Sequence, residues 1–357
     1  MSDRILPRDD LRALDGYHSA QIDVPVRLNT NESPYPPPDS FVDQWLDRMR
    51  ATDLNRYPDR EARALRNRLG EFLGQPRQRI FAANGSNEVL QTLLLTYGGP
   101  GRSAVMFEPT YALHSHIARI TATEVVAGER SADFSVDVDA AAELVASVRP
   151  NIVFLCSPNN PTGTVDDRAQ IERIASIAAE FGALVVVDEA YGEFASWSAM
   201  ELVDESRPIV IVRTYSKVWS LAAVRLGFAI APAWAVEELE KVALPYALSV
   251  PTLAAGEVAL DFRSEMEHRV AALVEERGRL FAAMAEVPGL EVFPSGANFL
   301  LFRCDDDARA VWEGLIARGV LVRDFSRWPR VEQCLRVSVG TPAENDAFLA
   351  ALREVRE

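Results

Sequence analysis

The stretch PIVIVRTYSKVWSLAAVRLGFAIAP, residues 208–232, contains two apolar runs separated by a polar segment. Short apolar runs that end in polar or turn residues are typical of strands buried on both faces of a sheet. The polar segment places one lysine, Lys217, close to Thr214 and Ser216, and Arg225 follows eight residues later. The stretch therefore predicts two sheet strands with a polar site at the end of the first.

Similar runs alternate with helical patterns along much of the chain. Further apolar runs are SAVMFEP (103–109), NIVFLCSP (151–158) and ALVVVDEA (183–190). Segments with helical periodicity are EARALRNRLGEFLG (61–74), GSNEVLQTLLLTYG (85–98), DVDAAAELVASVR (137–149) and DDRAQIERIASIAAEFG (166–182). This alternation predicts an α/β fold in which helices flank a mainly parallel sheet.

A chain of 357 residues is too long for one core of usual size, so two domains are expected. After Pro245 the pattern changes to a long charged helical region at about 252–286, followed by GANFLLFR, a helix, GVLVRDF, CLRVSVG and a terminal helix from Pro342. We expect a large domain at 35–245, a smaller α+β domain at 246–357, and an N-terminal arm at 1–34 that packs on the smaller domain.

Composition narrows the classes of function. The net charge of −15 argues against nucleic-acid and membrane partners, so local basic groups must hold any anionic ligand. The charged start has no apolar segment of a signal peptide or membrane anchor, which predicts a cytoplasmic protein. Cys156, Cys304 and Cys334 show no CxxC pairing and are expected to be buried and reduced. His114 and His116 would point to opposite sides of a helix, so no metal site is expected.

Polar residues at strand ends mark the expected site, because ligands of open α/β sheets bind at the carboxyl ends of the strands. Residues 85–87 (Gly-Ser-Asn) begin a helix whose free N–H groups suit a phosphate, although a plain helix cap would look the same. The rigid turn CSPNNPTGT presents Asn160. Asp188 ends an apolar run, where a poorly solvated carboxylate needs a cation, strong donors or a helix-capping role, and Tyr191 follows three residues later.

One ligand accounts for a phosphate cradle, a carboxylate for a ring cation, donors for a ring oxygen and a lysine. Pyridoxal 5′-phosphate carries an aldehyde, a phosphate arm and a pyridine nitrogen. A hydrolase that uses the serine and lysine of YSK is a rival interpretation, but it leaves Asp188 and Arg225 without a role. The strand-end residues therefore favour a pyridoxal-phosphate enzyme.

An ordered set of motifs between residues 27 and 341 resembles a known family. The motifs are RLNTNESPYPP, NRYPD, NGSNE, EPTY, SPNNPTG, DEAY, TYSK, ANFLLFR, VRDF and LRVSVGT. Together they resemble fold type I pyridoxal-phosphate aminotransferases, most closely the histidinol-phosphate aminotransferase family. The resemblance implies histidinol phosphate as amino donor, 2-oxoglutarate as acceptor and a role in histidine biosynthesis.

Neighbouring families keep the substrate open. Aromatic amino acid aminotransferases and threonine-phosphate decarboxylases resemble this chain in the same cofactor motifs and would use similar arginines. A non-enzymatic, cofactor-sensing regulator on the same fold is a remote alternative, because it would need an added basic DNA-binding segment. A specialised pathway, in place of histidine biosynthesis, also stays open.

The resemblance implies specific catalytic roles. Lys217 would form the Schiff base with the cofactor and then move a proton between the substrate α-carbon and the cofactor. Asp188 would keep the pyridine nitrogen protonated. Asn160, which also borders the substrate, and Tyr191 would hydrogen-bond the ring 3′-oxygen. Tyr111 would stack on the ring, although a tyrosine in the core is the commoner outcome.

The resemblance also assigns the two ends of the ligand site and an oligomeric state. The residues expected around the cofactor phosphate are Ser86, Asn87, Thr214, Ser216 and Arg225. Tyr57 would reach the phosphate in the neighbouring subunit of a homodimer, unless it is a plain surface residue. Arg323 and Arg336, in apolar strands where unpaired charge is costly, would bind the distal anion of the substrate with help from Tyr17.

Three positions and one motif, NESPYP at residues 31–36 in place of the usual NENPYG, depart from the family pattern. Ser220 and Ala223 stand where glycines are usual, so the local turn is expected to differ or to be strained. His114 replaces a second aromatic residue three positions after Tyr111. These departures put the substrate in question more than the cofactor.

Overall fold

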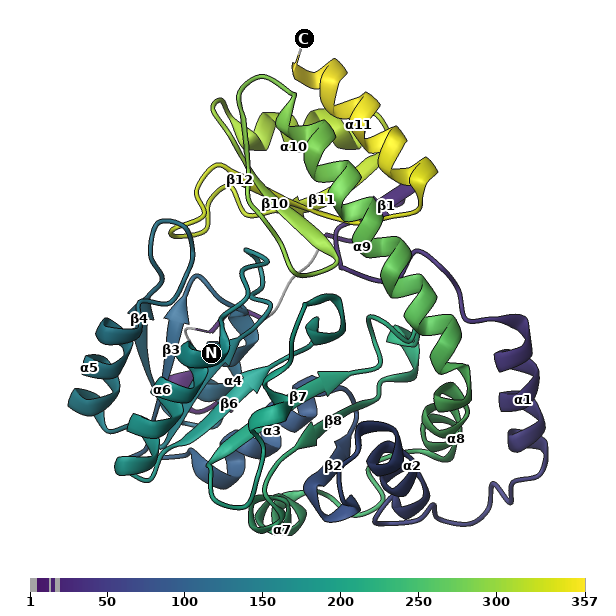
Figure 1. Ribbon diagram of the computed structural model, residues 1–357, viewed down its shortest axis with the longest axis vertical. Helices are drawn as coiled ribbons and strands as arrows, with labels where there is room; N and C mark the ends of the chain where they lie inside the picture. The colour runs from purple at the N-terminus through teal and green to yellow at the C-terminus, as the bar shows by residue number, and fades with distance from the viewer. Residues whose placement is uncertain (1–4, 13, 17–19, 357) are drawn as a thin grey trace.

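The computed structural model describes residues 5–12, 14–16 and 20–356. Its elements gather around two β-sheets, a seven-stranded sheet in the lower part of Figure 1 and a five-stranded sheet in the upper part. The long helix α9 (Arg263–Ala285) runs from one part to the other.

The seven-stranded sheet has the order β2-β8-β7-β6-β5-β3-β4. In that order the strands are β2 (Ile80–Ala83), β8 (Gly227–Ile230), β7 (Ile209–Thr214), β6 (Leu184–Asp188), β5 (Ile152–Cys156), β3 (Ser103–Glu108) and β4 (Glu124–Glu129). All neighbours are parallel except that β8 runs antiparallel to both β2 and β7. This arrangement confirms the predicted mainly parallel sheet.

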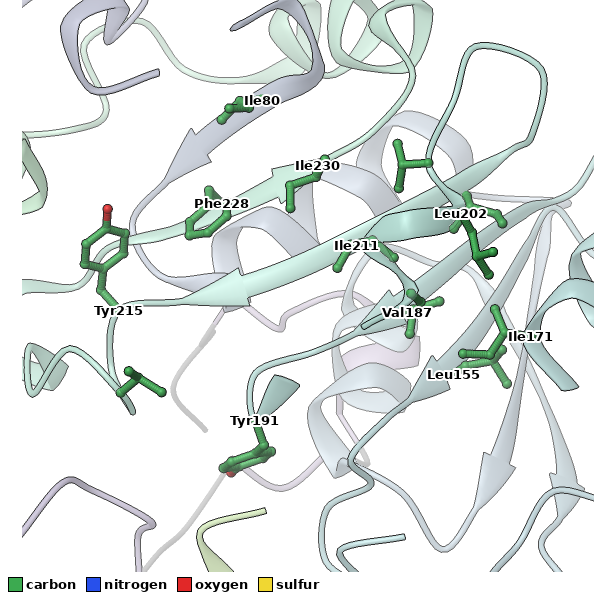
Figure 2. Close-up of a cluster of buried hydrophobic side chains, with 14 of the residues drawn as sticks. Ile80, Leu155, Ile171, Val187, Tyr191, Leu202, Ile211, Tyr215, Phe228 and Ile230 are labelled. Carbon is green, nitrogen blue, oxygen red and sulfur yellow. The ribbon is translucent and has the colours of Figure 1, made fainter. Parts of the chain in front are cut away.

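Helices cover both faces of this sheet. They are α2 (Arg63–Leu73), α3 (Ser86–Tyr97), α4 (Ala112–Ile120), α5 (Val138–Val148), α6 (Arg168–Glu180), α7 (Ala233–Val242) and α8 (Val250–Ala259), and α1 (Asp39–Arg50) lies further out, against α8. Successive strand residues point to opposite faces, so Val187 and Ile211 join one core cluster, part of which Figure 2 shows, and Val186 and Val212 join another. Burial on both faces explains the unbroken apolar runs of β5, β6 and β7.

The five-stranded sheet has the order β1-β11-β12-β10-β9. Its strands are β1 (Val26–Leu28), β11 (Val320–Asp324), β12 (Cys334–Ser338), β10 (Phe299–Cys304) and β9 (Leu290–Val292), and α10 (Ala308–Ala317) and α11 (Pro342–Arg356) complete this part. β1 pairs in parallel with β11, so a segment near the N-terminus lies in a sheet made otherwise of C-terminal strands. The chain reaches the larger part from β1 by way of residues 29–38.

The helical region predicted at about 252–286 consists of α8 and α9 with a short 3-10 turn, Leu260–Phe262, between them. Phe262 at this turn packs edge-on against Phe41 of α1, with the ring centroids 5.9 Å apart. α8 itself packs against α1 and α2 beside the seven-stranded sheet.

Candidate active site

A cavity of about 430 Å³ lies where the carboxyl ends of β5, β6 and β7 face β11 and β12. Twelve of the residues that the sequence singled out line it: Ser86, Asn87, Tyr111, Asn160, Asp188, Tyr191, Thr214, Ser216, Lys217, Arg225, Arg323 and Arg336. Ten of them lie at one edge of the seven-stranded sheet, where the carboxyl ends of its parallel strands meet beside the start of the antiparallel β8, whereas Arg323 and Arg336 come from the five-stranded sheet. Tyr17 lies outside the described residues.

Lys217 follows β7 and extends into the cavity, where its Nζ donates a hydrogen bond of 2.9 Å to the carbonyl oxygen of Thr30. Burial, and to a smaller extent the positive charges of Arg336 and Arg225, lower the pKa of Lys217 to about 8, while Glu32 opposes the change. A substantial fraction of the amine is therefore neutral near physiological pH, as a nucleophile or a proton acceptor requires.

Asp188 ends β6 with only 2% of its surface exposed. Its Oδ1 accepts a hydrogen bond from the backbone N–H of Ala190 at 3.0 Å, and its Oδ2 lies 2.9 Å from Nε2 of His114. The fully buried His114 ring stacks on Phe154, with the centroids 5.0 Å apart. We assign the Nε2–H tautomer, because the facing carboxylate is an acceptor and His114 Nδ1 has no hydrogen-bond partner among the described residues.

The contact of His114 with Asp188 is one that the sequence did not reveal. Its replacement of a family aromatic suggested an effect on the substrate, yet the structure places it behind Asp188, on the carboxylate. The available signal was its spacing, since a residue three positions after Tyr111 on α4 lies on the same helix face.

Tyr191 and Asn160 both line the cavity. The Tyr191 hydroxyl accepts a hydrogen bond from Nδ2 of Asn31 at 2.9 Å, and burial raises the pKa of Tyr191 to about 12. Tyr191 therefore stays protonated at physiological pH and can donate a hydrogen bond. The buried Asn160 accepts a hydrogen bond from Arg336 through its Oδ1.

One end of the cavity suits an anion. No side chain caps the N-terminus of α3, which begins at Ser86 after Gly85, whose φ is 79°. Arg225 Nη1 donates to the hydroxyl of Ser216 at 3.2 Å, and that hydroxyl also accepts from Thr214 at 3.0 Å. A Cβ on Gly85 would lie 2.6 Å from Nη2 of Arg225, so glycine permits the guanidinium to approach the helix end. The helix dipole and the guanidinium act on the same point.

The turn after Lys217 shows how the chain accommodates Ser220 and Ala223 at positions where the family usually has glycine. Ser220 has a φ of 55°, in the left-handed region that favours glycine, and strain of this kind costs on the order of 1 kcal/mol. Its hydroxyl donates to the hydroxyl of Ser33 at 2.9 Å, which helps to hold the conformation. Ala223 lies in the short 3-10 helix Ala222–Val224, where glycine is not needed.

The opposite end combines cations with aromatic rings. Arg323 of β11 pairs in register with Arg336 of β12. Both guanidiniums lie over the Phe325 ring, at 5.9 Å and 5.4 Å from its centroid, and Arg336 also lies 5.0 Å from the centroid of Phe299. Trp328 completes the wall at this end. Such a surface suits a small molecule that has an anionic group and a flat ring.

Tyr57 lies outside this cavity. Its side chain is 81% exposed and its ring stacks on Tyr246 at 4.6 Å between centroids. The role of Tyr57 in a neighbouring subunit therefore stays a prediction. Among the described residues, no helix is long and apolar enough to span a membrane, and no cluster of histidine, cysteine and acidic side chains is arranged to bind a metal.

Comparison with known proteins assigns the family. The model of the family "Aminotransferase class I and II" matches residues 23–352. A histidinol-phosphate aminotransferase of Rhodococcus opacus is 45% identical over 359 residues, which cover 98% of this chain and 92% of that protein. One of Corynebacterium efficiens is 42% identical, with coverage of 98% and 94%.

A solved structure agrees. The histidinol-phosphate aminotransferase of Sinorhizobium meliloti, in complex with pyridoxal 5′-phosphate, is similar with a TM-score of 0.85 and 25% identity, over 93% of this chain and 91% of that one. The mainly parallel sheet, the cavity at its strand ends and the match over nearly the whole chain all indicate the same family. The chain belongs to the class I and II aminotransferases, among the histidinol-phosphate aminotransferases.

Proposed function

We propose that this protein is a pyridoxal-phosphate aminotransferase that takes its amino group from histidinol phosphate and passes it to 2-oxoglutarate. The observation that carries the proposal is one cavity in which an uncapped helix end, a buried carboxylate and a lysine of lowered pKa converge. The family to which the chain belongs supports the same activity.

The residues present fit the cofactor. Arg225, Ser216 and the N-terminus of α3 form a cradle for its phosphate, and Gly85 leaves the room that a Cβ would fill. Asp188 offers a buried carboxylate to the ring nitrogen, and Tyr111 lines the cavity from the start of α4. When bound, pyridoxal phosphate supplies an aldehyde that bonds to amines and a ring that withdraws electrons from the adjacent carbon.

Each catalytic side chain has a defined task in this proposal. Lys217, as a neutral amine, would take the proton from the substrate α-carbon and hold it for return to the carbon that then carries the transferred amino group. Asp188 holds the proton on the ring nitrogen, and His114 keeps the carboxylate in place by donating to its other side. Asn160 and Tyr191 orient the ring through its 3′-oxygen.

Arg323, Arg336 and the aromatic wall support the choice of substrate. Histidinol phosphate has a phosphate and an imidazole ring, which match the two guanidiniums and the rings of Phe325 and Trp328. The distal carboxylate of 2-oxoglutarate would use the same cations. An aromatic amino acid carries one carboxylate and no phosphate, so it would bring no second anion to this end.

Two measurements test the function. Borohydride reduction followed by peptide mass mapping should find the phosphopyridoxyl group on Lys217. A half-reaction panel of histidinol phosphate, histidinol, phenylalanine, tyrosine and phosphothreonine should then show the fastest change of cofactor absorbance with histidinol phosphate. Histidinol is the matched control, because it lacks only the phosphate. A preference for phenylalanine, or release of carbon dioxide from phosphothreonine, would replace the proposed substrate.

We also propose a homodimer in which Tyr57 reaches the partner's cofactor phosphate. Exposed apolar side chains occur on this surface, among them Leu54, Leu244 and Tyr246. The residue after Tyr246, Ala247, accepts a hydrogen bond from Asn84 at 3.0 Å, two residues before the start of α3. The apolar surface therefore adjoins the anion end of the cavity.

The organisation and location of the chain follow the same proposal. We propose an arm at 1–34, a large part at 35–245 and a small part at 246–357, with α8 and the start of α9 as the connection that lies against the large part. The pairing of β1 with β11 supports an arm that belongs with the small part. A cytoplasmic location is supported by Cys156, Cys304 and Cys334, which are free and buried.

A further inference from the structure

Residues 29–33, the strap, lead from β1 along the cavity and contact three of its functional side chains in succession. The carbonyl oxygen of Asn29 accepts a hydrogen bond of 3.0 Å from Arg336, and that of Thr30 accepts one of 2.9 Å from Lys217. Asn31 then donates from Nδ2 to the hydroxyl of Tyr191 at 2.9 Å. The strap is thus in contact with the substrate end, the lysine and the ring-orienting tyrosine at once.

Asn31 itself is held on every side. It is 1% exposed, with a φ of 56° that asparagine tolerates better than most residues. Its backbone N–H donates to the hydroxyl of Ser338 at 2.9 Å, and that hydroxyl donates back to Asn31 Oδ1 at 2.9 Å. The carbonyl oxygen of Asn31 accepts from Asn298 at 3.2 Å.

This closed arrangement decides which way the Asn31 amide faces. The Ser338 hydroxyl accepts from the backbone N–H, so its own hydrogen needs an acceptor, and Asn31 Oδ1 supplies one. The amide nitrogen must then face Tyr191. A reversed amide would leave the Ser338 hydrogen without that acceptor.

The donor and acceptor count at Tyr191 follows from this orientation. A phenol has one hydrogen, and an oxygen that already accepts from Asn31 is free to donate that hydrogen elsewhere. The Tyr191 ring packs edge-on against Phe299 at 5.0 Å between centroids, which restricts its rotation. The remaining direction for the hydroxyl hydrogen is into the cavity that Tyr191 lines.

We propose that Asn31 is a positioning residue that directs the Tyr191 hydroxyl hydrogen toward the ligand, so that Tyr191 acts as a donor to an anionic ligand oxygen. Under the proposed function, on which this inference rests, that oxygen is the 3′-oxygen of the cofactor ring. Ser338 fixes the orientation of the Asn31 amide. Because Ser338 belongs to β12, the five-stranded sheet thereby influences the geometry of the cofactor site. The charged groups that face Tyr191 are Lys217, Asp188 and Arg336.

The test is a cycle of Asn31→Asp and Tyr191→Phe in the cofactor-loaded enzyme. The new carboxylate has nearly the shape of the amide but only accepts, so the Tyr191 hydrogen would turn toward it and away from the ligand. The readout is the pH at which the absorbance of the bound cofactor titrates. Loss of a donor makes the 3′-oxygen more basic, so both single variants should shift this midpoint upward by about 0.5–1 pH unit.

The double variant distinguishes an effect of Asn31→Asp that acts through Tyr191 from a direct effect of the new negative charge on the cofactor. If Asn31 acts through Tyr191, adding Asn31→Asp to Tyr191→Phe should shift the midpoint by less than half of its effect in the wild type. An equal shift in both backgrounds would be a direct effect of the new charge and would overturn the inference. Ser338→Ala is the second variant, and it should shift the midpoint in the same direction by a smaller amount. An unchanged midpoint in Ser338→Ala would refute the role of Ser338 in fixing the Asn31 amide.

Failure of the inference is distinguishable from failure of the function. A wild-type protein that shows no covalent cofactor at Lys217 removes the proposed function itself. A wild type that binds and titrates normally, with variants that do not follow the cycle above, removes only the role of Asn31. Urea unfolding of each variant checks that the fold is intact.

Discussion

Lys217 offers a direct test of the electrostatics of the cavity. The pKa is lowered from 10.5 to about 8, which corresponds to roughly 3 kcal/mol in favour of the neutral amine. At about pH 7.5 roughly a quarter of the side chains would be neutral, against about one in a thousand for an unperturbed lysine. Because the neutral form is the nucleophile, the amine should react about two hundred times faster than an exposed lysine of equal intrinsic reactivity.

Two substitutions should move the Lys217 midpoint in opposite directions. Arg336 lowers the pKa of Lys217, so Arg336→Gln should raise the midpoint, whereas Glu32→Gln should lower it because Glu32 acts the other way. We expect a change of about 0.5–1 pH unit in each case, since each variant removes one nearby charge.

The assay is the rate of trinitrophenylation of cofactor-free protein as a function of pH, resolved by peptide mass mapping. The chain has only one other lysine, Lys241, which is exposed and paired with Glu238, so it serves as an internal control in the same sample. A wild-type midpoint near pH 10 for Lys217, or two variants that shift in the same direction, would refute the reasoning.

Further predictions concern the cradle, the dimer and a buried ion pair. Arg225→Lys should weaken cofactor binding by about 10–100-fold in equilibrium dissociation, because one ammonium replaces a two-pronged donor. Hybrids of Tyr57→Phe with Lys217→Ala subunits should regain one intact site, and a monomer at micromolar concentration would contradict this. Arg130 and Asp166 form an ion pair with both side chains 1% exposed, so Arg130→Met should cost about 3–5 kcal/mol in urea unfolding. Adding Asp166→Leu should recover most of that loss, and no recovery would argue against an unpaired charge as its cause.

Local sequence was enough for the frame of the molecule. The apolar runs of β5, β6 and β7 predict that these strands are buried, because strands that are covered on both faces are apolar at nearly every position. Once those strands are parallel, the residues that follow them must meet at one edge. Asp188, Lys217 and the start of α3 were therefore predictable as neighbours without any knowledge of loop structure.

The contacts that tune this site lie between residues remote in sequence, and only the tertiary structure decided them. His114 meets Asp188 across 74 positions, Asn31 meets Tyr191 across 160, and Arg336 meets the strap across 307. No periodicity encodes such pairs, because each depends on how two separately folded elements pack. The sequence put Asn31 in the N-terminal arm without a role, and the pairing of β1 with β11 brought that segment onto the lysine. The sequence determined which chemical groups stand at the strand ends, and tertiary packing decided their hydrogen-bond partners, because partner choice depends on distances between elements and not on the order of residues within one.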